Sequence, residues 1–203
     1  MRSDDRFPND GGIMAVLRDL VFIHSAGPQG GNSGSTGLIS RLEEALGDEF
    51  HIIAPLMPDP ERPDIDGWLA EIAKTVSQAR SGAVLMGHSL GGSSILQYLA
   101  RNPQIWRDNN RFAAIFSIAA PFWGLEDWEV TDFSLTEDEL AVLTGCRPMH
   151  FCHSKDDKIV GFAHSETYLQ HFPQTDQIAL NDAEHALSDG DITALIEKIR
   201  IYA

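Results

Sequence analysis

Short apolar runs separated by amphipathic stretches constrain this chain more than any other feature of its sequence. Each run holds a few consecutive apolar residues and stops at glycine, proline or polar residues. Runs of this length are typical of strands that are buried on both faces of a parallel sheet. The predicted strands cover residues 20–23, 51–54, 83–86, 112–118, 148–152 and 177–180.

Helical patterns lie between these runs. Ser35 or Thr36 is placed to cap a helix that ends near Gly47, and Asp64 is placed to cap the next one. Further helices are predicted after residue 89, after a capping box that starts at Thr136, over 160–171 and over 192–201. This alternation predicts an α/β fold with a mostly parallel sheet of about six strands and helices on both faces. We expect a single domain over residues 18–203, preceded by a polar, mobile leader over residues 1–17.

Charge and composition argue against several classes of partner. The chain has 203 residues, of which 43% are hydrophobic and 22% charged, as in ordinary globular proteins. Its net charge of −15 repels phosphate backbones and anionic lipids, so we expect neither a nucleic acid nor a membrane partner. The first residues lack the apolar core of a signal peptide, and the two cysteines are too few for a typical secreted disulfide framework. These features favour a cytoplasmic location.

Residues 87–91 read Gly-His-Ser-Leu-Gly, which is a G-x-S-x-G motif. The motif works as a sharp turn between a strand and a helix, with the serine exposed at its tip. An apolar run precedes the motif here and a helical pattern follows it, as this turn requires. The interpretation is that Ser89 is a nucleophile and that the N–H of Leu90, at the start of the helix, stabilises an oxyanion.

A serine nucleophile needs a base and an orienting carboxylate. His185 lies in a polar loop after the last predicted strand, where it can reach Ser89 at the carboxyl edge of the sheet. Asp156 and Asp157 both follow the fifth strand. We favour Asp157, because the apolar pair that begins two residues later fits a loop that turns directly into a helix. The resulting chain order of Ser, Asp and His is that of the hydrolase arrangement.

The loop after the first predicted strand reads HSAGPQGGNSGSTG. Its glycines allow the backbone to approach a ligand, and the N–H of Ala26 is the first choice for a second oxyanion donor, with Ser25 as the alternative and as a substrate contact. His24 is expected to shape this loop, and His88 to point away from the nucleophile. The loop has neither a Walker Gly-Lys-Ser/Thr nor a G-x-G-x-x-G pattern, so nucleotide binding is not expected.

Residues 121–135, PFWGLEDWEVTDFSL, fit neither a strand nor a helix. We assign Phe122, Trp123 and Trp128 to substrate binding, as a lid or as the wall of a pocket. The alternative is a loop that its aromatic side chains anchor to the core.

Metal binding is not expected either. His150, Cys152 and His153 are close in sequence, but the alternation of side chains along a strand sends His153 to the opposite face. Three ligands on two faces do not converge on one ion.

Four segments carry a resemblance to a known family: LVFIHSAG, VLMGHSLGG, HSKDDKIV and AEHAL. With them the chain resembles the α/β-hydrolase superfamily and, more narrowly, the compact serine hydrolases of the retinoblastoma-binding-protein-9 type, which lack a large cap domain. The resemblance implies an acyl-enzyme mechanism on a small-molecule acyl substrate, with Ser89, Asp157 and His185 as catalytic triad and no cofactor or metal. Thioester and amide substrates fit the same chemistry. The alternative is a non-catalytic or weakly catalytic binding protein on a hydrolase scaffold.

Overall fold

Six strands form one parallel sheet in the computed structural model, which describes residues 17–31, 33–107, 111–125, 128–146 and 148–203. The strand order is β2-β1-β3-β4-β5-β6, and every neighbouring pair is parallel. The strands are β1 (Arg18–Ile23), β2 (Phe50–Ile53), β3 (Ala83–His88), β4 (Phe112–Ile118), β5 (Met149–Ser154) and β6 (Asp176–Leu180). The predicted sheet is therefore confirmed. The predicted leader lies outside the described residues, except for residue 17.

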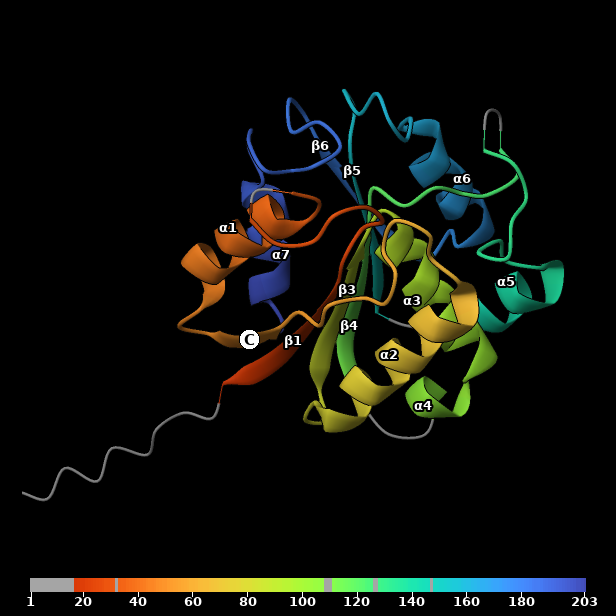
Figure 1. Cartoon of the computed structure of the whole chain (residues 1–203), viewed down its shortest axis with the longest axis horizontal. Helices are drawn as coiled ribbons and strands as arrows, with labels where there is room; N and C mark the ends of the chain where they lie inside the picture. The colour runs from red at the N-terminus through yellow and green to blue at the C-terminus, as the bar shows by residue number, and fades with distance from the viewer. Residues whose placement is uncertain (1–16, 32, 108–110, 126–127, 147) are drawn as a thin grey trace, which may run out of the picture.

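Helices cover both faces of this sheet, as predicted (Figure 1). The helices are α1 (Thr36–Leu46), α2 (Ile65–Gln78), α3 (Leu90–Arg101), α4 (Gln104–Arg107), α5 (Glu137–Leu143), α6 (Ala163–His171) and α7 (Thr193–Arg200). Helices α1 and α7 pack on one face, where Leu38 and Leu195 belong to the same buried cluster as Phe22. Helices α2, α3, α5 and α6 pack on the other face, where the cluster includes Trp68 and Ile95. Across the described residues, no helix combines the length and apolarity needed to cross a bilayer.

Two of the predicted caps are present. The Asp64 carboxylate accepts a hydrogen bond of 2.7 Å from the backbone N–H of Gly67, and Thr136 forms a capping box with Glu139. Ser35 precedes α1, but its hydroxyl makes no cap and bonds to other loops. The first helix therefore begins where predicted without the predicted side-chain cap.

Helix α6 begins at Ala163 rather than at residue 160, which corrects the sequence prediction. The backbone N–H groups of Ile159 and Val160 donate to the Asp157 carboxylate at 2.8 and 2.9 Å. These bonds hold the chain in a turn before the helix can start.

The sheet changes its direction of growth between β1 and β3. The chain passes from β1 to β2 at one edge, and then returns so that β3 pairs with β1 on its other side. The loops that follow β1 and β3 consequently lie at the same carboxyl edge, and diverge over opposite faces. Open parallel sheets bind their ligands at such a switch point.

Candidate active site

Ser89 occupies a sharp turn between β3 and α3. Its backbone has φ 53 and ψ −120, a region that L-residues rarely adopt, and its N–H donates to the carbonyl of Ile118 at 2.8 Å. The turn brings α3 against the end of β1 so closely that a Cβ on Gly91 would collide with the carbonyl oxygens of Ile23 and His24. Glycine at position 91 therefore allows the strand and the helix to approach.

The structure brings Ser89, His185 and Asp157 together in one hydrogen-bonded chain. His185 Nε2 lies 3.1 Å from Ser89 Oγ, and His185 Nδ1 lies 2.8 Å from Asp157 Oδ2. A carboxylate only accepts hydrogen bonds, so Nδ1 carries a proton, which corresponds to the imidazole tautomer whose Nε2 accepts from the serine hydroxyl. This is the tautomer that a general base needs.

The Asp157 carboxylate has a fully buried side chain and four hydrogen-bond donors. Besides His185 and the turn N–H groups, His153 Nε2 lies 3.2 Å from Oδ2. Burial alone would raise the pKa of Asp157, but the hydrogen bonds from His153 and His185 outweigh it and hold the pKa well below its usual range. Asp157 therefore stays charged at neutral pH.

Asp156 has different partners. Its Oδ1 accepts from the Ser154 hydroxyl and, at 3.1 Å, from the backbone N–H of Glu184. Glu184 directly precedes His185 and has a positive φ of 50. Asp156 therefore fastens the loop that carries His185, whereas Asp157 contacts the imidazole.

The two predicted oxyanion donors flank Ser89. Leu90 is the first residue of α3, so its N–H has no acceptor within the helix. Ala26 borders the same cavity as Ser89 and Leu90. The N–H of Ser25, the alternative donor, is bonded to Ser35 Oγ at 2.8 Å. This bond leaves Ala26 as the better candidate of the two.

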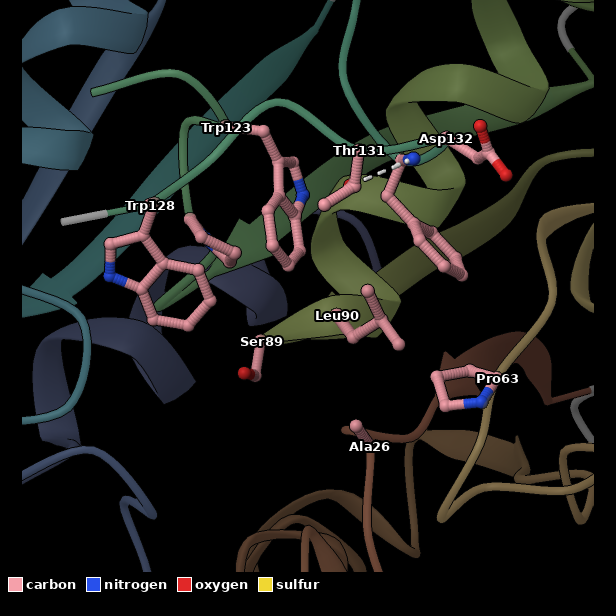
Figure 2. Close-up of a pocket in the computed structure, with 10 residues that line it drawn as sticks. Ala26, Pro63, Ser89, Leu90, Trp123, Trp128, Thr131 and Asp132 are labelled. Atoms are coloured by element: carbon pink, nitrogen blue, oxygen red, sulfur yellow. Dashed lines mark hydrogen bonds between the residues drawn. The ribbon is translucent and has the colours of Figure 1, made fainter. Parts of the chain in front are cut away.

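A cavity of about 390 Å³ opens next to Ser89 (Figure 2). Its wall is apolar on most sides, and the rings of Trp123 and Trp128 lie above Ser89. The Asp132 carboxylate points away from the cavity in this view. The lining residues are Ala26, Pro63, Ser89, Leu90, Pro121, Trp123, Trp128, Thr131, Asp132 and Phe133.

The segment that carries both tryptophans is anchored to α3. Trp123 Nε1 donates to Ser93 Oγ at 3.2 Å. The side chain of Gln97, which is fully buried, donates to the carbonyls of Asp132 and Ser134 at 2.8 and 2.9 Å. The sequence left two alternatives for this segment, a pocket wall and a loop anchored to the core. The two are compatible, because the segment is anchored to α3 and also lines the cavity.

Phe122 and Ser25, both assigned to substrate binding, do not line this cavity. Phe122 stacks on His171 and meets Tyr168 edge to face. Ser25 is buried in contact with Ser35. The cavity therefore gives no support to these two assignments, because a loop sequence does not show which of its side chains face inwards.

Sequence reasoning missed two contacts around the site. His153 Nε2 lies 3.2 Å from Asp157 Oδ2, and His88 lies against His185, with its Nε2 2.8 Å from the His185 carbonyl oxygen. The second partner of His88 is Ser35. No motif relates these positions, because their sequence separations are set by the sheet topology.

The described residues contain no group of three His, Cys, Asp or Glu side chains that could hold a metal ion. Cys146 and Cys152 are free and buried, and burial raises the pKa of Cys146 to about 12 and that of Cys152 further. Neither thiol is activated for nucleophilic chemistry.

Residues 20–194 match the sequence profile of the alpha/beta hydrolase family. The chain belongs to this family. No curated protein matches its sequence significantly.

Solved structures share the fold at low sequence identity. The ydeN gene product from B. subtilis is 19% identical with a TM-score of 0.72, over 92% of this chain and 98% of that one. The thioesterase domain from the curacin biosynthetic pathway is 10% identical with a TM-score of 0.69, over 91% of each chain. Est1E from Butyrivibrio proteoclasticus is 14% identical with a TM-score of 0.68, over 92% of this chain and 86% of that one.

Proposed function

We propose that this chain is a serine hydrolase that cleaves a carboxylic ester or a related acyl bond. The observation that carries the proposal is the hydrogen-bonded chain from Ser89 Oγ through His185 to Asp157, at the mouth of an apolar cavity. Membership of the alpha/beta hydrolase family supports the same reading.

The geometry suggests a role for each group. His185 Nε2 takes the proton of the Ser89 hydroxyl as the oxygen attacks the acyl carbon, and Asp157 stabilises the imidazolium that forms. The N–H groups of Leu90 and Ala26 hold the developing oxyanion. His185 then protonates the leaving group, and water attacks the acyl-enzyme with His185 again as base. Every step uses groups of this chain.

The cavity favours an uncharged, apolar small-molecule substrate. Trp123, Trp128 and Phe133 provide aromatic surface, and the described residues that line the cavity include no lysine, arginine or histidine. A buried anionic group on the substrate would lack a counter-charge there, and desolvating it would cost more than the aromatic surface returns. The net negative charge of the chain also disfavours anionic substrates, because it repels them.

The proposal also includes a narrower family and a cellular location. The likeness to compact hydrolases of the retinoblastoma-binding-protein-9 type rests on the four sequence segments. The expectation of a cytoplasmic location rests on the low cysteine content.

Hydrolysis of p-nitrophenyl esters from acetate to decanoate tests the proposal. We expect turnover by the wild type that is lost in Ser89→Ala and unchanged in Ser77→Ala, which removes an exposed hydroxyl on α2. Matched thioesters and amides then define the preferred acyl bond. If Ser89→Ala retains the wild-type rate, the nucleophile is wrong, and a wild type without turnover on any of the three bonds supports the binding-protein alternative.

A further inference from the structure

Four residues form a buried line of hydrogen bonds beside Ser89. Ser25 N–H donates to Ser35 Oγ at 2.8 Å, and the two serine hydroxyls lie 3.1 Å apart. Ser35 Oγ lies 2.9 Å from His88 Nδ1, and His88 Nε2 lies 2.8 Å from the backbone carbonyl oxygen of His185. Ser35 and His88 are almost completely buried, so water does not compete for these bonds.

The acceptors fix the direction of each bond. A carbonyl oxygen only accepts, so His88 Nε2 carries a proton. Burial and the neighbouring His185 lower the pKa of His88 to about 3, so the ring is neutral and Nδ1 accepts from the Ser35 hydroxyl. The Ser25 hydroxyl then donates to Ser35. Every donor in the line has one acceptor, which leaves His88 a single arrangement.

The two ends of this line lie in two loops, and the proposed reaction depends on how these loops are placed relative to each other. Ser25 directly precedes Ala26, the candidate oxyanion donor, in the loop after β1. At the other end is the backbone of His185, in a loop where Asp182 and Glu184 have φ values of 54 and 50. Strained backbone of this kind persists only where surrounding contacts enforce it.

We propose that His88 is a positioning residue that ties the loop carrying the oxyanion donor to the loop carrying the base. His88 lies on the buried side of the site, with its ring centroid 5.1 Å from that of His185, and it is not among the cavity-lining residues. It therefore acts through His185 and Ala26 and does not contact the substrate. This inference rests on the proposed function for its catalytic consequence, but not for the link between the loops.

Two replacements of His88 distinguish the effect of its hydrogen bonds from the effect of its side-chain volume. His88→Leu fills a similar space but removes both bonds, whereas His88→Gln offers one amide N–H donor and one carbonyl acceptor. We expect kcat to fall roughly 10- to 100-fold in His88→Leu with KM within about twofold, because a small misplacement of catalytic groups is costly. His88→Gln should recover most of the loss.

Ser35→Ala tests whether the line acts as a unit. It should lower kcat less than His88→Leu, and the double variant should be no worse than His88→Leu alone, because residues of one network are not additive. Fully additive losses in the double variant would contradict a single line.

His150→Leu is the matched control. His150 is also a buried histidine, but it lies on β5 with Tyr202 and Phe116 as its neighbours. We expect it to lower the melting temperature without lowering kcat. If His88→Leu behaves in the same way, His88 is only a structural residue and the inference is wrong.

Amide hydrogen exchange, measured without substrate, tests independently of activity whether His88 links the two loops. We expect faster exchange at Ser25 and across residues 182–186 in His88→Leu but not in His88→Gln. Unchanged exchange in either loop overturns the inference, whatever the enzyme hydrolyses. Absence of Ser89-dependent turnover in the wild type would instead overturn the proposed function and leave the exchange result standing.

Discussion

At the level of single residues, Asp156 and Asp157 are neighbours in sequence, but their carboxylates have different partners. Asp157 is oriented by two turn N–H groups and faces His185, while Asp156 binds Ser154 and the backbone before His185. The side chain next to the imidazole sets its tautomer, and the other one sets the position of its loop.

Replacing each aspartate by asparagine distinguishes the role of Asp157 from that of Asp156. We expect Asp157→Asn to lower kcat roughly 10³- to 10⁴-fold, because an amide cannot stabilise the imidazolium and can present an N–H to Nδ1. Asp156→Asn keeps an acceptor for Glu184 and should cost less than about tenfold. Steady-state kinetics on one ester compares them. A larger loss in Asp156→Asn would reverse the assignment.

The sequence indicated the residues of the site that belong to local patterns. The G-x-S-x-G motif predicts Ser89, and the loops after the fifth and sixth apolar runs place Asp157 and His185. His153 and Ser35 were missed as partners of Asp157 and His88, because hydrogen bonding to a given acceptor depends on packing. For the same reason, the sequence did not show that Phe122 and Ser25 are absent from the lining of the cavity.

At the level of secondary-structure elements, the segment between β4 and α5 forms the wall of the cavity. Trp123 and Trp128 contact each other edge to face with ring centroids 5.0 Å apart, and both rings line the cavity. Hydrogen bonds join Trp123 to Ser93, and Gln97 to the carbonyls of Asp132 and Ser134, so α3 supports this wall.

Alanine at Trp123 or Trp128 should therefore weaken binding of bulky acyl groups. Loss of about 1–2 kcal/mol of apolar contact predicts a KM increase of roughly 5- to 30-fold for phenylacetate or decanoate esters, and little change for acetate. Phe122→Leu, in the same segment but outside the cavity, is the control. Equal effects on acetate and decanoate would show that the wall does not bind the acyl group.

The contact between β1 and α3 makes a second prediction. Gly91→Ala should destabilise the protein by about 3 kcal/mol or more, since its Cβ would collide with the backbone carbonyl oxygens of Ile23 and His24. Gly161→Ala, where the added Cβ meets nothing, should change stability by less than about 0.5 kcal/mol. Urea denaturation compares the two, and similar midpoints would contradict the close approach.

Strands were easier to predict than helices. Five of the residues in β1 and all six in β3 are buried, and continuous burial produces the apolar runs that mark their positions. Helix α4 (Gln104–Arg107) is a four-residue helix without a buried residue, so it has no periodicity to detect. Helix α6 starts late because hydrogen bonds to Asp157 override local helical preference.

For the molecule as a whole, buried histidines make stability depend on pH. Burial lowers the pKa of His24, lowers that of His150 to about 4 and, together with His185, lowers that of His88 to about 3. Between those values and the unfolded pKa of about 6.5, the unfolded chain binds more protons than the folded one, so stability falls as pH falls.

We expect the melting temperature to drop by roughly 10 °C between pH 7 and pH 5. Below about pH 4, Asp19 and Asp157 add to the loss, because their lowered pKa values favour the folded state only while the unfolded carboxylates are ionised. His150→Gln should reduce the drop between pH 7 and 5. A melting temperature that is constant over this range would mean that the histidines are accessible to protons in the folded state.

Labelling with a fluorophosphonate, followed by intact mass and peptide mapping, tests the proposed nucleophile most directly. The reagent phosphonylates a serine only when a base and an oxyanion site activate it. We predict one adduct, on Ser89, that is absent in Ser89→Ala, retained in Ser77→Ala and strongly slowed in His185→Gln. No adduct on the wild type, or an adduct that persists in Ser89→Ala, would contradict Ser89 as an activated nucleophile.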